Sequence, residues 1–188
     1  GRGMFREGNN SKPKILCPTH LLTKVEDITL AEGKFRLNEE SDHSPEAREF
    51  IENYYQSFSW GNSGKEEATK FLEEISQIPE EAKSFLLNNK LCSHYLLNLE
   101  PNLQLLFQRF ASTRAFTFQN KSLLAPIWEL VNHSPFSPPI KATKNGAETP
   151  AYRSDLTTNE VFQAYKRKGS PISIFFNYGF ASNEIFTY

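Results

Sequence analysis

The strongest constraint on the fold is a change in hydrophobic period along the chain. Residues 45–111 carry apolar side chains at helical spacing, and the segments before and after them do not. This stretch opens at Ser44-Pro45, an N-cap followed by a first-turn proline. Prolines or loop residues then predict three further helix starts, after the loop 61–64, at Pro79 and at Pro101.

The flanking segments favour short strands and loops. Residues 1–44 are expected to be irregular or β-rich. The runs 115–118 and 123–127 flank a polar turn and predict a hairpin. The prolines and glycine of residues 135–150 predict a loop.

Two short patterns follow that loop. Residues 158–166 are compatible with a short helix or with a strand. Residues 172–177 alternate in polarity and predict a strand that ends at Tyr178-Gly179.

The resulting order, β then helical then β, predicts an α+β fold with an inserted helical lobe. We expect an N-terminal β-segment at 1–44, the lobe at 45–111 and a C-terminal β-segment at 112–188. A chain of 188 residues can bury such a core without disulfides or metals.

Composition excludes several classes of function. A formal charge of −1 argues against direct nucleic-acid binding, which needs a basic surface. Two cysteines cannot build a disulfide scaffold or a four-thiolate zinc site, and the four histidines lack paired metal spacing. We find no membrane-length apolar run and no signal peptide, so we expect an intracellular protein, cytoplasmic or nuclear.

One glycine-rich loop looks briefly like a phosphate-binding motif. In Gly61-Asn62-Ser63-Gly64-Lys65, however, the first glycine and the final Ser/Thr of that motif are missing. We therefore interpret the segment as a plain loop between helices.

Three segments, taken together, point to a specific chemistry. Asn132-His133-Ser134 follows an apolar run that contains Glu129. Thr113-Arg114-Ala115-Phe116 precedes it, and a segment ending in Tyr178-Gly179 follows it, with Ser182-Asn183 beyond. Alone, the Asn-His pair would equally suit two side chains that satisfy backbone groups at a chain crossing.

In this order the segments resemble SET-domain protein lysine methyltransferases, and most closely the Rubisco large-subunit methyltransferase branch. The opening Gly1-Arg2-Gly3 is similar to the family's Gly-x-Gly start. The helical stretch stands where this branch carries its inserted helical region. The resemblance implies a SET-domain β-fold of short sheets, and S-adenosylmethionine as cofactor.

The resemblance also implies a cofactor site. Arg114 would hold the carboxylate of the donor, a task that suits an Arg fork. Gly1 and Gly3 would let the backbone approach the ligand closely. Asn132 and His133 would bind its amino group and adenine, partly through backbone atoms. Glu129 stands where the branch usually has Asp, and an acid there could support the donor's ammonium.

The same resemblance makes Tyr178 the expected catalytic residue, lying beside the transferred methyl group as well as the cofactor. The implied reaction is methyl transfer from the sulfonium to a lysine side chain of a protein. Alternatives are a catalytically silent SET-like interaction module and a protein histidine methyltransferase. No metal is expected, and the protein is expected to be a monomer whose partner presents a lysine.

The sequence departs from the family's pattern near its C-terminus. Gly169-Ser170-Pro171 replaces a common Gly-Glu, and because we interpret that acid as structural we give the replacement little weight. The family's second Tyr-Gly-Phe would fall beyond Tyr188, so Tyr188 is not equated with its tyrosine. Because position 1 is not Met, we expect a processed chain or a fragment. We also expect the chain to be truncated at its C-terminus.

Overall fold

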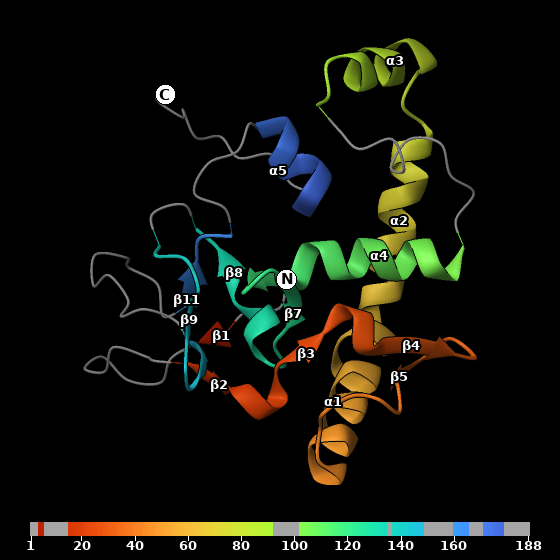
Figure 1. Cartoon of the computed structure of the whole chain (residues 1–188). Helices are drawn as coiled ribbons and strands as arrows, with labels where there is room; N and C mark the ends of the chain where they lie inside the picture. The colour runs from red at the N-terminus through yellow and green to blue at the C-terminus, as the bar shows by residue number, and fades with distance from the viewer. Residues whose placement is uncertain are drawn as a thin grey trace. The chain divides into compact units, whose positions relative to one another are not determined.

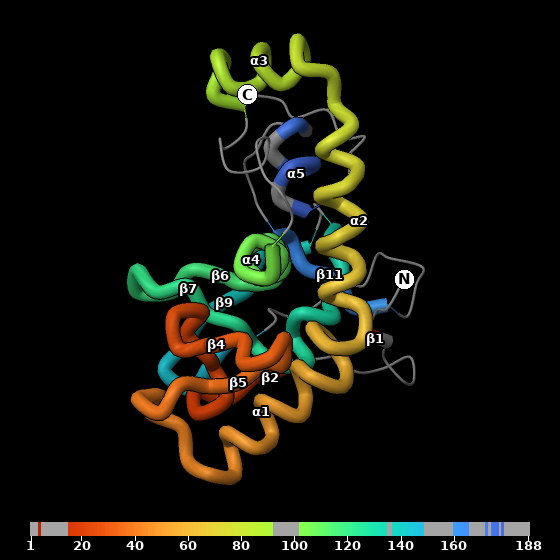
Figure 2. The backbone as a smooth tube through the Cα atoms, turned by 90° about the vertical axis from the view of Figure 1, so that its right-hand side faces the viewer, coloured from red at the N-terminus to blue at the C-terminus, as the bar shows by residue number. Residues whose placement is uncertain are grey.

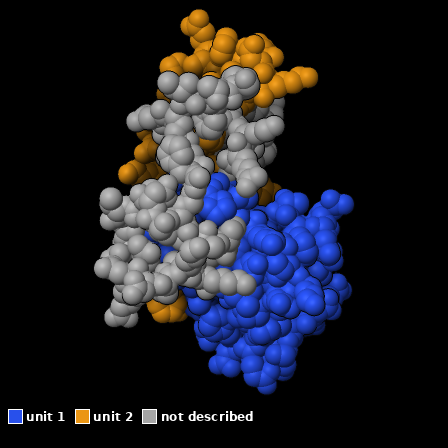
Figure 3. Space-filling model, turned by 90° about the vertical axis from the view of Figure 1, so that its left-hand side faces the viewer, with its two compact units in different colours: residues 1–29, 36–54, 114–167 blue, residues 30–35, 55–113, 168–188 orange. Residues whose placement is uncertain are grey.

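The computed structural model describes residues 4–5, 15–91, 102–134, 137–148, 160–165 and 171–178. Contacts divide the chain into two compact units, shown in Figure 3. Unit 1 comprises residues 1–29, 36–54 and 114–167, and unit 2 comprises residues 30–35, 55–113 and 168–188. Some boundaries between the units fall inside regular elements. For example, the chain passes from unit 1 to unit 2 between Tyr54 and Tyr55, which belong to the same helix.

The described residues form short strands and five α-helices, labelled in Figure 1. The strands are β1 (Met4–Phe5), β2 (Leu16–Pro18), β3 (Thr23–Lys24), β4 (Ile28–Ala31), β5 (Lys34–Leu37), β6 (Phe116–Phe118), β7 (Lys121–Leu124), β8 (Asn132–His133), β9 (Lys141–Thr143), β10 (Gly146–Glu148) and β11 (Glu160–Gln163). The helices are α1 (Pro45–Phe58), α2 (Lys65–Ser76), α3 (Glu80–Asn88), α4 (Leu103–Arg114) and α5 (Pro171–Tyr178). The predicted α+β class is confirmed, and no described helix has both the length and the apolar character needed to cross a membrane.

Unit 1 contains three small sheets among the described residues, with strand orders β1-β11-β8, β2-β10-β9 and β3-β7-β6. The strands pair antiparallel, except that β8 runs parallel to β11. The β6–β7 hairpin turns at Gln119 and Asn120, both with positive φ, as its polar turn predicted. These sheets bring segments from both ends of the sequence into one unit.

The core of the β2-β10-β9 region is formed by Cys17, Ala125, Trp128 and Ala147, all of them buried. Partly buried apolar side chains from neighbouring loops and strands pack against this cluster. Its small alanines allow the large indole of Trp128 to fill the interior at close packing. Trp128 thereby anchors the short 3-10 helix η5 (Trp128–Leu130) to unit 1.

Unit 2 has an aromatic core. Phe35 stacks on Tyr55 with ring centroids 4.5 Å apart. Trp60 meets Phe107 and Phe110 edge to face, at 5.7 and 5.4 Å. Such offset and edge-to-face pairs are the arrangements that aromatic rings prefer, so a few large side chains fill this interior.

Helices α2, α4 and α5 of unit 2 lie close to one another. In Figure 2, α4 is seen along its axis, with α2 and α5 beside each other. Phe71 of α2 contacts Phe175 of α5, with ring centroids 6.0 Å apart. Ile174 and Phe176 of α5 are buried, which accounts for the packing of this short helix on its neighbours.

The predicted strand at 172–177 is wrong, because these residues form helix α5. A short apolar run does not distinguish a strand from a buried helix by period alone. Pro171 occupies the first helical position, where a proline has no hydrogen bond to lose. The helix start was therefore signalled by Pro171, and the alternation after it was misleading.

Four smaller expectations are also changed or resolved. The predicted loop 135–150 contains the β9–β10 hairpin, and the ambiguous segment 158–166 contains a strand, β11. The predicted loop 61–64 lies in a π-helical turn, η3 (Trp60–Gly64), that leads directly into α2. Helix α4 continues to Arg114, past the predicted end at 111. The boundaries drawn at 44 and 111 for the lobe stay a prediction.

Candidate functional site

The first group of predicted site residues meets in unit 1. Arg114 is the last residue of α4, and Glu129 lies in η5. Arg114 Nε is 3.5 Å from Glu129 Oε2, and the Glu129 side chain is only 1% exposed. The Arg114 side chain is 22% exposed, so this ion pair has one buried partner and one that reaches solvent.

The local chain geometry explains why Glu129 points inward. Ile127 has φ 68°, an uncommon conformation for a β-branched residue, and it turns the chain sharply before η5. Trp128 and Val131 are buried on either side of the short helix. The carboxylate of Glu129, which lies between these two residues in the sequence, is buried with them. Burying a carboxylate costs free energy unless the group is paired and hydrogen-bonded.

Tyr54 supplies one of the required hydrogen bonds. Tyr54 lies in the part of α1 that belongs to unit 1. Its hydroxyl donates a hydrogen bond to Glu129 Oε1, and the two oxygens are 3.2 Å apart. Burial, and secondly the negative charge of Glu129, raise the pKa of Tyr54 far above its usual range. The phenol therefore stays protonated and remains a donor to the carboxylate at every physiological pH.

Asn132 and His133 form β8 and lie beside β11. Asn132 Nδ2 donates to Glu160 Oε1 at 2.5 Å. His133 Nδ1 accepts the backbone N–H of Tyr165 at 3.1 Å, and the two rings lie 5.2 Å apart. These contacts are of the kind expected for side chains that satisfy polar groups where two segments meet.

The contact with Tyr165 also defines the chemical state of His133. An imidazole nitrogen that accepts a hydrogen bond carries no proton, so neutral His133 holds its proton on Nε2. Tyr165 is fixed in turn by its hydroxyl, which donates to the Val131 carbonyl at 2.8 Å. The segment that links Glu129 to His133 is thus held in place by Tyr165, two residues after the end of β11.

Tyr178 belongs to unit 2, where it is the last residue of α5. Its side chain is half-buried, and burial raises the pKa of the Tyr178 hydroxyl. At neutral pH the group is therefore a phenol that can donate a hydrogen bond. Its predicted catalytic role remains a prediction.

Gly1 and Gly3, predicted to contact the cofactor, lie outside the described residues. The structure brings Arg114 and Glu129 into contact. Asn132 and His133 follow Glu129 closely in the sequence, form β8 and belong to the same unit. The roles of all these residues in cofactor binding remain predictions. Among the described residues, no cluster of three or more His, Cys, Asp or Glu is placed to hold a metal ion.

Sequence reasoning missed Tyr54 and Glu160. Tyr54 was assigned to the apolar face of its helix, and nothing in that pattern indicates that its hydroxyl meets Glu129. Glu160 lies in a segment that was ambiguous between helix and strand. A carboxylate at a strand start that pairs with an Asn of the neighbouring strand could be found only from the β8–β11 register.

Comparisons with known proteins give one distant structural likeness. No protein-family model matches the chain, and no curated protein matches it. The chain is similar to a crystal structure of the SET domain of LSMT bound to lysine and AdoHcy, with a TM-score of 0.39 and 13% identity. The match covers 90% of this chain and 47% of that one, so the chain spans about half of its length.

Proposed function

We propose that the chain is a SET-domain protein of the Rubisco large-subunit methyltransferase type that transfers a methyl group from S-adenosylmethionine to a protein lysine. The sequence motifs at Arg114, at Asn132-His133 and at Tyr178 support it. The observation that carries it furthest is the contact between Arg114 and the buried carboxylate of Glu129. Two residues that the motif comparison singled out separately are neighbours in space.

The charges of this region fit the donor. S-adenosylmethionine carries a carboxylate, an ammonium and a sulfonium, and so bears one net positive charge. Arg114 offers one cation, while Glu129 and Glu160 offer two carboxylates within the same unit. The cation matches the donor's carboxylate in sign, and the carboxylates match its ammonium and sulfonium.

A second feature also fits a bound ligand. The indole Nε1 of Trp128, next to Glu129, is buried and has no acceptor among the described residues. Buried donors are normally hydrogen-bonded, and each exception calls for an explanation such as a bound group. Trp128 would therefore offer a hydrogen-bond donor on η5, the short helix that also carries Glu129.

The roles of the residues follow from their chemistry. Bound at this place, the donor would supply an electrophilic methyl group. Arg114 would bind its carboxylate as a fork, and Glu129 would attract its ammonium. Tyr54 would keep Glu129 in orientation, since its hydroxyl already donates to that carboxylate. Asn132 and His133 would contribute backbone groups, because their Nδ2 and Nδ1 atoms bond to Glu160 and Tyr165.

Tyr178 is proposed as the catalytic residue. A lysine amine must be neutral to attack, and deprotonating it at pH 7 costs about 4.6 kcal/mol from a pKa near 10.4. A water-poor site lowers this cost because it disfavours the ammonium. The protonated, half-buried hydroxyl of Tyr178 suits a group that orients the reacting atoms without itself ionising.

Two other functions share this fold and these residues. A silent SET-like module would use the same scaffold as a protein-interaction surface, since fold does not determine activity. A protein histidine methyltransferase would differ only in the acceptor. The proposal commits to a protein partner that presents a lysine, to no direct nucleic-acid binding and to a monomer.

Calorimetric titration of S-adenosylmethionine tests the donor site. We expect saturable one-site binding that Arg114→Gln weakens at least about tenfold, because a charge-assisted contact worth roughly 1.5–3 kcal/mol is lost. Arg36→Gln is the matched control, since it also breaks an Arg–Glu contact, at 2.8 Å to Glu52, but on the exposed side of β5. That control should keep the wild-type affinity.

Transfer of radiolabelled methyl groups from S-adenosylmethionine to the proteins of an extract then distinguishes the lysine methyltransferase, the histidine methyltransferase and the silent module. Label in methyl-lysine after hydrolysis supports the lysine enzyme, and label in methyl-histidine points to the histidine enzyme. Donor binding without any transfer favours the silent module. A folded wild-type chain that binds no donor would overturn the proposal.

A further inference from the structure

A buried arginine in unit 2 bonds to the end of helix α5. Arg109 of α4 is only 4% exposed. Its Nη1 donates a hydrogen bond to the carbonyl oxygen of Phe176. Its guanidinium carbon lies 3.5 Å from the ring centroid of Phe71, so the planar cation stacks on that ring.

The bonded carbonyl belongs to a particular part of α5. The last four carbonyls of an α-helix have no partner within the helix, and Phe176 is the third residue from the end of α5. A cation is favoured there because the helix dipole is negative at that end. Arg109 thus provides both a donor and a positive charge where the helix needs them.

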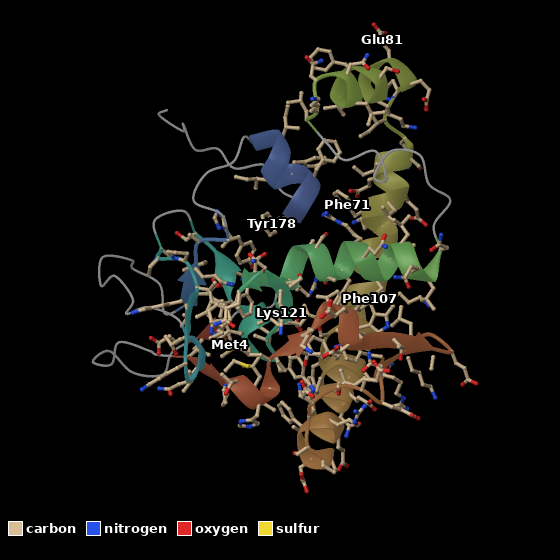
Figure 4. The ribbon with its side chains drawn as sticks, viewed as in Figure 1. Met4, Phe71, Glu81, Phe107, Lys121 and Tyr178 are labelled. Carbon is tan, nitrogen blue, oxygen red and sulfur yellow. The ribbon has the colours of Figure 1, made fainter. Side chains whose placement is uncertain are left out.

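Aromatic contacts fix the same turn. Phe71 also meets Phe175 of α5, at 6.0 Å between ring centroids, and Phe175 meets Phe176 at 5.4 Å. Phe71 therefore contacts both Arg109 and α5. Figure 4 labels Phe71 on α2 and Tyr178 at the end of α5. Tyr178 follows Phe176 by two positions, so its backbone emerges from the turn that Arg109 holds.

We infer that Arg109, stacked on Phe71, is a positioning residue that fixes the last turn of α5 and thereby orients the Tyr178 hydroxyl for methyl transfer. The inference rests on the proposed function, because it gives Arg109 a role in that reaction. Arg109 itself acts through α5. The inference deepens the proposed function because it assigns a role to a residue outside the three sequence motifs.

The chemistry of the contact requires arginine. A guanidinium can stack its flat face on a ring and at the same time donate in its own plane to a carbonyl. A lysine ammonium is a compact charge without a flat face, so it cannot reproduce both contacts. Arg109→Lys therefore keeps the charge and removes the geometry, while Phe71→Leu keeps the arginine and removes the aromatic surface.

The experiment compares wild type, Arg109→Lys and Phe71→Leu by two readouts. The first is the pKa of the Tyr178 phenol in the free protein, measured by NMR of ¹³C-labelled tyrosine. The signal is assigned with Tyr178→Phe among the seven tyrosines. Because burial raises this pKa in the wild type, we expect both variants to lower it as the last turn of α5 loosens.

The second readout is steady-state kinetics. We expect kcat to fall about tenfold or more in both variants, as small misplacements of a catalytic group cost this much or more. The dissociation constant of S-adenosylmethionine should stay within about twofold, because Arg114 and Glu129, which would hold the charged groups of the donor, belong to unit 1, whereas Arg109, Phe71 and α5 belong to unit 2. A residue that only stabilised the fold would not separate kcat from donor affinity in this way.

Arg48→Lys is the matched control. Arg48 also donates to backbone carbonyls, those of Leu37 and Asn38, at 2.8 and 2.9 Å, but it does so in unit 1. This variant should lose thermal stability while it keeps the Tyr178 pKa and kcat of the wild type. A matching pKa shift in Arg48→Lys would show that general loosening, and not Arg109, governs Tyr178, and would overturn the inference.

The pKa readout needs neither donor nor acceptor, so the two proposals can fail separately. An unchanged Tyr178 pKa in folded Arg109→Lys and Phe71→Leu overturns the inference, whatever the activity. If Arg109→Lys does not fold, Phe71→Leu decides it alone. A wild-type chain without donor binding overturns the proposed function, while a shifted pKa in the variants still supports the control of Tyr178 by Arg109.

Discussion

At the scale of single residues, backbone conformation makes some positions intolerant of a side chain. Gly146 begins β10 with φ +137°, and a Cβ added there would lie 2.0 Å from the Cys17 carbonyl oxygen in the paired strand β2. Gly33 also has a positive φ, of +77°, but a Cβ there would meet nothing within 4 Å. An alanine at Gly33 would therefore introduce conformational strain alone, whereas an alanine at Gly146 would introduce both strain and steric overlap.

We expect Gly33→Ala to lower the free energy of unfolding by about 1–2 kcal/mol, the cost of a left-handed conformation for an L-residue. Gly146→Ala should cost about 1–3 kcal/mol more, because backbone must also move. Urea denaturation of both variants measures the difference. Equal losses would contradict the steric argument for Gly146.

The thiol of Cys17 gives a prediction about pH. The side chain is 4% exposed, and burial raises the pKa of Cys17 to about 12 from 9.0. The native state therefore binds this proton more tightly than the unfolded state does. The resulting stability is fully present below pH 9 and is lost as the pH rises toward 12.

We expect Cys17 to resist alkylation by iodoacetamide at pH 8 in the folded protein and to react quickly in urea, because the thiolate is the nucleophile. The measurement uses Cys92→Ser so that only one thiol is counted. In the same background, Cys17→Ala should flatten the loss of stability between pH 9 and 12. Rapid native alkylation at pH 8 would contradict the burial of this thiol.

At the scale of elements, the Tyr54 hydroxyl joins α1 to η5 through the buried Glu129 carboxylate. Tyr54→Phe should lower the free energy of unfolding by about 1–3 kcal/mol, the cost of leaving a buried charged group with one hydrogen bond fewer. Chemical denaturation at pH 7 measures this change. Tyr54→Phe combined with Glu129→Gln should lose less than the sum of the two single variants, because they share one interaction. Strict additivity would show that the two side chains do not interact in solution.

At the scale of the whole molecule, each unit carries one of the chain's two tryptophans. Trp128 is buried in unit 1 and Trp60 in unit 2. Helix α1 belongs partly to each unit, so neither unit can unfold fully without breaking a helix that the other also contains. We expect Trp60→Phe and Trp128→Phe each to show one fluorescence transition that coincides with loss of helical circular dichroism. A separate midpoint for fluorescence in either variant would show that the units unfold independently.

The sequence alone predicted the elements whose signals are local. The helices between 45 and 111 follow from apolar spacing and, for α1 and α3, from prolines at or just before their starts, signals that act within a few residues. The β6–β7 hairpin follows from a polar turn whose residues tolerate positive φ. The α+β class follows from the order of these elements, so it too could be read without tertiary contacts.

Only the tertiary structure decided the features that depend on residues far apart in the chain. Residues 172–177 become helix α5, with Ile174 and Phe176 buried in unit 2 and the last turn bonded to Arg109. Glu129 meets Arg114 and Tyr54 because a sharp turn at Ile127 directs it inward. Periodicity reports which face of an element is apolar, but it carries no information on which polar atoms of distant elements come within hydrogen-bonding reach. The individual candidate residues could therefore be named from the sequence, whereas their partners could not.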